Sequence, residues 1–172
     1  EARKIAEEAF RLLKECGPDT SIGIITFYSA QRDLIFEYLE HFGVAEKVHE
    51  SGSWRVTGKW SLTHNGEERL RVGTVDGFQG KEFDIVLLSA VRANDMRIPM
   101  SDPDPNVIEK AANRKYGHLR LANRMNVAMS RQRSLLVTVG DSQMARGAMA
   151  AMAVPALVGF FELCGGEHGT VR

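Results

Sequence analysis

Four short runs with strand character, separated by amphipathic stretches, constrain the fold of this chain more than any other feature. The runs are Ser21–Phe27, Arg71–Val75, Ile85–Val91 and Ser134–Val139. Two of them, Ser21–Phe27 and Ile85–Val91, are mostly apolar, which is typical of strands buried on both faces of a sheet. The stretches Glu1–Cys16 and Ala30–Phe42 each carry one apolar stripe, which predicts a helix. This order of elements predicts an α/β fold with a mostly parallel sheet flanked by helices.

The remaining segments are less regular. Residues 44–69 predict a small hairpin insertion, with a turn at Asn65-Gly66 and two tryptophans in its core. Residues 94–118 are polar, contain three prolines and predict a surface excursion. Helical periodicity predicts four further helices, at Asn106–Asn113, Leu119–Met129, Ala145–Met152 and Ala156–Leu163.

The length of 172 residues suits one domain with a sizeable core, which we place at residues 1–164, followed by a flexible tail at 165–172. Two distant cysteines argue against a structural disulfide and favour a reducing, intracellular compartment. The five histidines show no metal-ligand spacing, so we expect no metal site. The longest apolar stretch, Ala148–Phe161, is interrupted by a proline and falls short of the ~20 residues needed to span a bilayer. The chain starts with Glu inside a predicted helix, so we expect a piece of a longer protein.

Positive charge is concentrated in one part of a chain that is neutral overall. Residues 110–140 contain no acid and seven cations: Lys110, Arg114, Lys115, Arg120, Arg124, Arg131 and Arg133. Helical spacing would place Arg120, Arg124 and Arg131 on roughly one face. An ordinary solvated face normally mixes both signs, so the missing acids favour a surface that meets phosphate.

The loop after the second strand combines chemistry suited to a nucleotide. Gly77 and Gly80 would let backbone N–H groups approach a phosphate, and Glu82 could accept a hydrogen bond from a ribose hydroxyl. In the alternative interpretation the glycines only serve a strand-exit turn, and spacing alone does not separate the two.

Ligands of open α/β sheets bind at the carboxyl ends of the strands. Four polar segments are expected there: Tyr28–Arg32, Asp76–Glu82, Arg92–Asn94 and Asp141–Gln143. The position of Arg131, which comes just before the last strand, stays open with respect to that edge. In the first of these segments Tyr28 offers a stacking ring, Ser29 a helix cap and Gln31 an amide.

Three segments together resemble one family. Ile24–Arg32, Arg71–Asn94 and Asn123–Asp141 are similar to motifs IV, V and VI of superfamily 1 helicases, with the senataxin-like branch (superfamily 1B) as the nearest group. The resemblance covers roughly residues 1–155, and the pairing of V-D-G-F-Q-G-K-E with N-V-A-M-S-R makes it specific. Two departures are Gly77, where many members have Ala, and Ser130-Arg-Gln-Arg133, where T-R-A-K is more common.

The resemblance implies a RecA-like domain of the P-loop NTPase fold, the second of two in a monomeric motor that uses ATP and Mg²⁺. It implies that Arg131 is the arginine finger and that Gln31, Gly80 and Glu82 lie near the nucleotide. It also implies that single-stranded DNA or RNA contacts a set of five residues: Tyr28, Thr74, Ser89, Arg92 and Asn94.

The phosphate loop G-x-x-x-x-G-K-[ST] is missing from this sequence, as is the acidic pair that holds magnesium. We therefore expect both to lie in the first RecA-like domain, and the isolated chain to be inactive. Two alternatives remain open: an inactive nucleic-acid-binding or scaffolding module derived from a helicase, and a different nucleotide-binding enzyme such as a kinase or reductase. We expect no membrane partner and a cytoplasmic location, or a nuclear one if the protein is eukaryotic.

Overall fold

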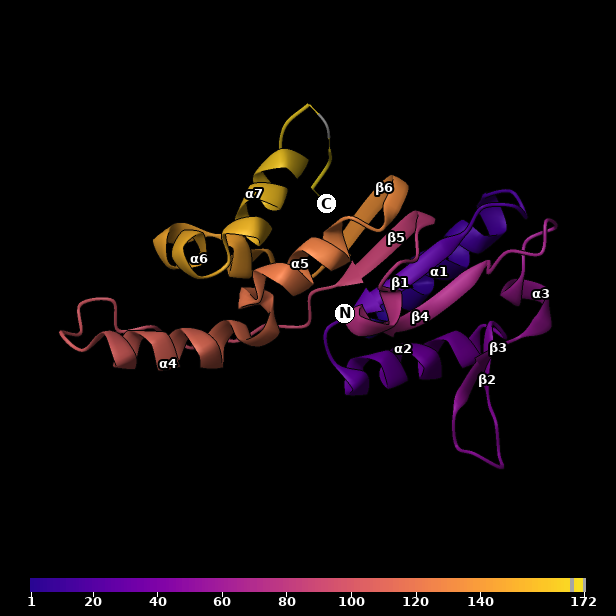
Figure 1. Cartoon of the computed structure of the whole chain (residues 1–172), viewed down its shortest axis with the longest axis horizontal. Coiled ribbons are helices and arrows are strands. Elements are labelled where there is room, and N and C mark those ends of the chain that lie inside the picture. Colours follow the sequence, from indigo (N-terminus) through magenta and orange to yellow (C-terminus); the bar gives the residue numbers. More distant parts are fainter. Residues whose placement is uncertain (168, 172) are drawn as a thin grey trace. The chain divides into compact units, whose positions relative to one another are not determined.

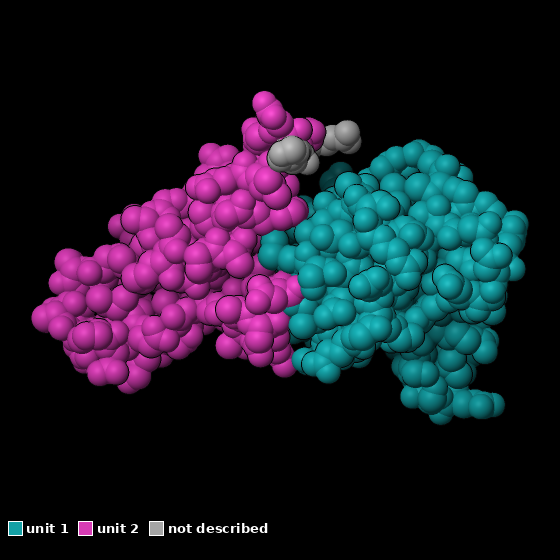
Figure 2. Space-filling view, turned by 45° about the horizontal axis from the view of Figure 1, so that its top comes forward, with its two compact units in different colours: residues 1–91, 127–139 teal, residues 92–126, 140–172 magenta. Residues whose placement is uncertain are grey.

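The structure is a computed structural model of the 172-residue chain and describes residues 1–167 and 169–171. The chain divides into two compact units, coloured separately in Figure 2. The first unit contains Glu1–Val91 and Val127–Val139, and the second contains Arg92–Asn126 and Gly140–Arg172. Two residues of the predicted flexible tail, His168 and Arg172, lie outside the described residues.

The first unit is built on a four-stranded sheet with the strand order β4-β1-β5-β6 (Figure 1). Its strands are β1 (Ile22–Thr26), β4 (Leu70–Thr74), β5 (Phe83–Ser89) and β6 (Gln132–Val139). All three pairings are parallel: β1 pairs with β4 and β5, and β5 pairs with β6. The predicted parallel α/β sheet is therefore confirmed, and the predicted strand ends are shifted by at most two residues.

Helices α1 (Ala2–Glu15) and α2 (Ser29–His41) pack together and cover one face of this sheet. The apolar stripe of α1 includes Ile5, Ala9 and Leu13, all buried. It meets Ile22 and Ile24, which lie two residues apart and so point to the same face of β1. This layer is the hydrophobic core of the first unit.

The opposite face of the sheet is covered by the segment between β4 and β5, which includes the 3₁₀ helix η1 (Val75–Phe78). The Phe78 ring is fully buried and packs against Phe83, with ring centroids 5.5 Å apart. Glycines in the two strands beneath make room for the ring. A Cβ atom on Gly23 would lie 2.9 Å from Phe78, and one on Gly73 would lie 3.1 Å from it. The eight residues 75–82 thus cross from the end of β4 to the start of β5 without a long helix.

The predicted hairpin insertion is confirmed. Strands β2 (Ala45–Lys47) and β3 (Trp54–Val56) pair antiparallel, and a short helix α3 (Gly58–Ser61) follows. The hairpin turn predicted at Asn65-Gly66 is wrong, because residues 48–53 join β2 to β3. Gly66, whose φ of +80° favours glycine, belongs to a separate turn between the bridged residues Leu62 and Glu68. Trp54 stacks on Phe36 with centroids 5.7 Å apart and Trp60 is buried, so both tryptophans serve the core as predicted.

The second unit is mainly helical. It contains α4 (Pro105–Tyr116), η2 (Gly117–Arg120), η3 (Ser142–Ala145), α6 (Gly147–Ala153) and α7 (Pro155–Cys164). Helix α5 (Ala122–Met129) contains the boundary between the units. The predicted single helix at Leu119–Met129 is wrong at its start, because Gly117–Arg120 form a separate 3₁₀ turn.

Within residues 1–167 and 169–171, no single helix has the length and apolar composition needed to cross a membrane. Helices α6 and α7 meet those two criteria only when taken together, and they are bent by 119° at the break between them.

Candidate functional site: two edges of the sheet

The strands end at one edge of the sheet, the carboxyl edge, and begin at the other, the amino edge. At the carboxyl edge three hydroxyl residues stand in register, because Thr26 pairs with Thr74 on one side and with Ser89 on the other. Gln31, in the first turn of α2, donates from Nε2 to Ser89 Oγ at 3.1 Å. Thr26, Ser89 and Gln31 are all buried. The carboxyl edge therefore brings together three predicted site residues, Gln31, Thr74 and Ser89, in a neutral arrangement in which Gln31 bonds Ser89.

Tyr28 occupies the N-cap position of α2 in an extended conformation, with φ −131° and ψ 134°. Its side chain is half-buried. The prediction that Ser29 caps this helix is wrong, since Ser29 is its first helical residue and no side-chain capping bond is formed.

The amino edge brings together Glu82 and Arg131. Glu82 comes directly before β5 and Arg131 directly before β6, and the Phe83 backbone N–H donates to the Arg131 carbonyl at 2.9 Å. Arg131 is half-buried, and its Nε donates to the Val127 carbonyl in the last turn of α5 at 3.2 Å. The guanidinium is therefore held at the helix–strand junction and is not buried in the core.

Further charges surround this pair. Arg133 lies 3.7 Å from Glu82 and 3.7 Å from Asp84. A hollow of about 190 Å³ opens beside them, and its lining consists of Ser21, Glu67, Glu68, Lys81, Glu82, Phe83 and Arg133. Each of the four strands contributes to it from its first residues or from the residues just before them. Carboxylate, ammonium and guanidinium groups in one hollow suit a polar, charged ligand.

Asp84 and Ser21 join the starts of β5 and β1. The backbone N–H and the hydroxyl of Ser21 donate to Asp84 Oδ2 at 2.8 and 2.7 Å. The backbone hydrogen bond from Ser21 is the main cause that lowers the pKa of Asp84; the Ser21 hydroxyl and Arg133 add to it, and partial burial opposes it.

The expectation that Asp76–Glu82 lies at the carboxyl edge is wrong for its last residue. Glu82 precedes β5, whereas Ser89 ends that strand. Seven strand residues span roughly 20 Å at about 3.3 Å per residue, so Gln31 beside Ser89 is far from Glu82 and Arg131. The prediction located residues 76–82 from the end of β4, where the connection begins. No sequence signal indicated that this connection crosses the sheet to the start of β5.

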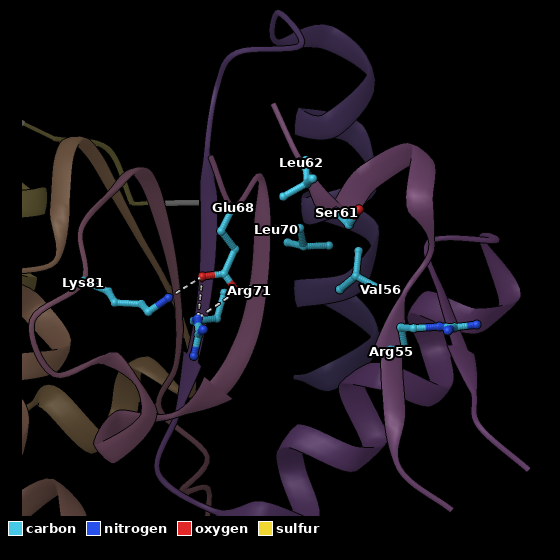
Figure 3. A pocket seen from close by; sticks show the side chains of 8 residues that line it. All are labelled: Arg55, Val56, Ser61, Leu62, Glu68, Leu70, Arg71 and Lys81. Atoms are coloured by element: carbon cyan, nitrogen blue, oxygen red, sulfur yellow. Dashed lines mark hydrogen bonds and ion pairs between the residues drawn. The ribbon is translucent and has the colours of Figure 1, made fainter. Parts of the chain in front are cut away.

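A network of three charged residues holds the loop that carries Gly80 (Figure 3). Glu68 accepts hydrogen bonds from Arg71 Nε at 2.8 Å and from Lys81 Nζ at 2.8 Å. Arg71 also donates from Nη1 to the Gly77 carbonyl at 3.1 Å. Burial of Glu68 opposes its ionisation, but the hydrogen bonds and charges of Arg71 and Lys81 outweigh this and lower its pKa.

The network therefore ties both ends of the loop to the start of β4. Gly80 itself has a φ of +73°, so of the two glycines in the loop it is Gly80 that requires the left-handed region. No sequence pattern singles out Glu68, because it is one of several acids in an irregular segment. Phe78 belongs to the V-D-G-F-Q-G-K-E segment, but its packing role depends on Gly23 in β1 and Gly73 in β4.

In the second unit, Arg92 and Asn94 contact the carboxyl end of α4. Asn94 Nδ2 donates to the Lys115 carbonyl at 3.0 Å, and Arg92 Nη1 donates to the Arg114 carbonyl at 3.4 Å. Both side chains thus satisfy carbonyls that the helix end leaves without intrahelical partners.

Acidic residues outside residues 110–140 neutralise part of the positive charge of that stretch. Arg120 pairs with Glu109 at 2.9 Å, just before that range, and Arg133 faces Glu82 and Asp84. The prediction that Arg120, Arg124 and Arg131 share one helix face is wrong, because Arg120 lies in η2 and Arg131 follows the end of α5. In the described part of the chain, His, Cys, Asp and Glu side chains form no group of three or more suited to a metal ion.

Comparison with known proteins agrees with these features. Residues 1–143 match the family described as "AAA domain". "Helicase required for RNAi-mediated heterochromatin assembly 1" of Schizosaccharomyces pombe is 30% identical over 144 residues, which are 84% of this chain and 11% of that protein.

Two proteins of Saccharomyces cerevisiae are also similar to this chain. "DNA polymerase alpha-associated DNA helicase A" is 32% identical over 72% of this chain and 12% of its own length. "ATP-dependent helicase NAM7" is 28% identical over 76% of this chain and 10% of its own length. The chain thus spans about a tenth of the length of the curated relatives it matches.

Proposed function

This chain belongs to the AAA domain family and is a superfamily 1 helicase domain with a RecA-like fold, and from that premise we propose that it is the second motor domain of an ATP-dependent helicase. The observation that carries the proposal is the adjacency of Glu82 and Arg131 at the amino edge, in a sequence without a phosphate loop. Such a domain supplies half of a nucleotide site and depends on another domain for the rest. We assign residues 1–164 to this domain.

The amino-edge residues fit the periphery of a nucleotide. Arg131 offers a planar guanidinium suited to a phosphate, Glu82 is an exposed acceptor, and Gly80 exposes backbone in the left-handed region. When bound, ATP supplies the phosphoryl group whose transfer to water provides the free energy for movement. Arg131 would stabilise the negative charge that develops on that group, and Glu82 would orient the ribose by accepting a hydrogen bond from one of its hydroxyls. Mg²⁺ and the phosphate loop belong to the first RecA-like domain, which is the partner within the same polypeptide.

We assign the carboxyl edge to single-stranded DNA or RNA. Thr74 and Tyr28 are half-buried there and offer a neutral hydroxyl and a ring, which suit a sugar–phosphate backbone and a base, whereas Ser89 is buried and supports the edge from beneath. Gln31 belongs with this edge because it bonds Ser89. The protein is then a monomeric, intracellular motor whose two ligands contact opposite edges of the sheet.

The substitution Arg131→Ala in the full-length protein tests this function. We expect ATP hydrolysis stimulated by single strands to fall by about 10³-fold or more, because an arginine finger contributes ~10³ to 10⁵ in rate. Equilibrium binding of a fluorescent ATP analogue should be retained. Arg3→Ala, which removes an exposed arginine of α1, is the matched control and should hydrolyse ATP normally. Unchanged turnover in Arg131→Ala would refute the assignment.

A further inference from the structure

Helix α4, which lies in the excursion at 94–118, has one buried face and one exposed face. Ala112 and Tyr116 are buried, whereas Asn106, Lys110, Asn113 and Arg114 are exposed. Spacings of four, seven and eight residues place the exposed set on one side of the helix. The helix is therefore anchored along one stripe and presents the other to solvent.

The exposed face is positively charged. The single acid of the helix, Glu109, is engaged by Arg120 at 2.9 Å, which also lowers the pKa of Glu109 through a hydrogen bond. Lys115 is turned back, with Nζ donating to the Met96 carbonyl at 2.8 Å. In the described part of the chain, the side chains of Lys110 and Arg114 make no hydrogen bond or ion pair. Favourable interaction with the helix dipole accounts for a cation in the last turn, but Lys110 lies a turn earlier.

The contacts at the end of α4 connect this face to the segment that leaves β5. Asn94 donates to the Lys115 carbonyl and its own carbonyl accepts from Lys115 Nζ at 3.3 Å, while Arg92 donates to the Arg114 carbonyl. These bonds fix α4 from the same two residues that the family resemblance places on nucleic acid. Their polar groups are used to hold the helix.

We propose that Lys110 and Arg114 form a second contact with the phosphates of the single strand, and that Arg92 and Asn94 are positioning residues that hold α4 in place for it. The proposal rests on the proposed function, since it names a further contact for the same class of ligand. The positive charge of this face of α4 is complementary to the phosphates of a nucleic-acid backbone, which is the ligand that we propose. The amides of Asn106 and Asn113 on the same face already donate to Asp104 and Glu109, so the two cations carry the proposed contact.

The test measures the binding of a fluorescent oligothymidylate to the full-length protein over a range of salt concentrations. Lys110→Gln/Arg114→Gln removes two charges and keeps good helix formers. Each phosphate contact contributes a slope of about 0.7 in log K against log salt for single strands, so the slope should decrease by about 1.4. The corresponding loss of affinity is about 25-fold at 0.1 M salt. Arg3→Gln/Lys4→Gln in α1 removes the same number of exposed charges and should leave the slope unchanged.

Asn94→Ala separates positioning from direct contact. Asn94 is neutral, so the loss of a direct contact would weaken binding without changing the salt slope. Positioning predicts a smaller slope in Asn94→Ala and no further decrease when Asn94→Ala is combined with the α4 substitutions. A wild-type slope in Lys110→Gln/Arg114→Gln overturns the inference. Failure of the unaltered protein to bind single strands would instead overturn the proposed function.

Discussion

The two edges of the central sheet differ in the kind of interaction that organises them. The carboxyl edge is buried and neutral, with hydroxyl groups in register and an amide bonded to one of them. The amino edge is open and charged, and ion pairs and charged hydrogen bonds hold its loop and its strand starts. A neutral edge suits a ligand that is moved along it, because weak contacts can be exchanged at every step. A charged edge with a held guanidinium suits a ligand whose charge changes during a reaction.

Phe78 lies in the segment that connects the two edges, so its substitution should have the largest effect. We expect Phe78→Ala to destabilise the chain by about 3–5 kcal/mol, because a fully buried phenyl ring is replaced by a cavity. Urea denaturation of the 172-residue chain measures this loss.

A double-mutant cycle with Gly73 tests whether the glycine exists to accommodate the ring. Gly73→Ala should destabilise the wild-type chain, since its Cβ would lie 3.1 Å from Phe78. In the Phe78→Ala background the same change should cost much less. Equal costs in both backgrounds would show that the ring does not set the identity of residue 73.

Two substitutions with opposite expected effects test whether ATP and nucleic acid bind at different edges of the sheet. Glu82→Ala should raise the KM for ATP by about 10- to 100-fold, which corresponds to the ~1.5–3 kcal/mol of a charged hydrogen bond, and should leave nucleic-acid affinity unchanged. Gln31→Ala should weaken nucleic-acid binding and leave the KM for ATP unchanged, because Gln31 lies at the carboxyl edge. Steady-state ATPase assays and oligonucleotide binding measure both. A raised KM for ATP in Gln31→Ala would instead support the position near the nucleotide that the family resemblance implies for Gln31.

The sequence predicted the sheet and most helices, because apolar runs and helical stripes are local signals. Ile22–Thr26 and Phe83–Ser89 are apolar enough to identify themselves as buried strands. The site was harder to predict, since it depends on how a connection crosses the sheet. No pattern within residues 75–82 predicts that Phe78 packs over Gly23 and Gly73. This packing holds the connection across the sheet, so that Glu82 lies at the amino edge. The pairing of Arg120 with Glu109 is likewise a tertiary contact that no local pattern contains.

Loss of the charged network around Glu68 should have a moderate effect on ATP binding and none on nucleic-acid binding. Glu68→Gln weakens the bonds to Lys81 and Arg71, and we expect the KM for ATP to rise about fivefold, as for the loss of ~1 kcal/mol. Glu46→Gln is the matched control, because Glu46 pairs with Arg55 in the exposed hairpin away from the loop. Nucleic-acid binding that fell together with ATP affinity would contradict the separation of the edges.

The smallest effect expected concerns acid stability, and it also distinguishes the edges. Because the folded chain lowers the pKa of Asp84 below its ordinary value of about 3.9, the ionised carboxylate is favoured by folding. This contribution is fully present above pH ~4 to 5 and is lost as the pH falls through the lower folded pKa. Asp84→Asn should therefore lower stability at pH 6 and reduce the difference in stability between pH 6 and pH 3, measured by urea denaturation. Ser89→Ala at the neutral edge should lower stability equally at both pH values. If Asp84→Asn left the pH dependence unchanged, the hydrogen bonds from Ser21 and the charge of Arg133 would not be what stabilises the start of β5.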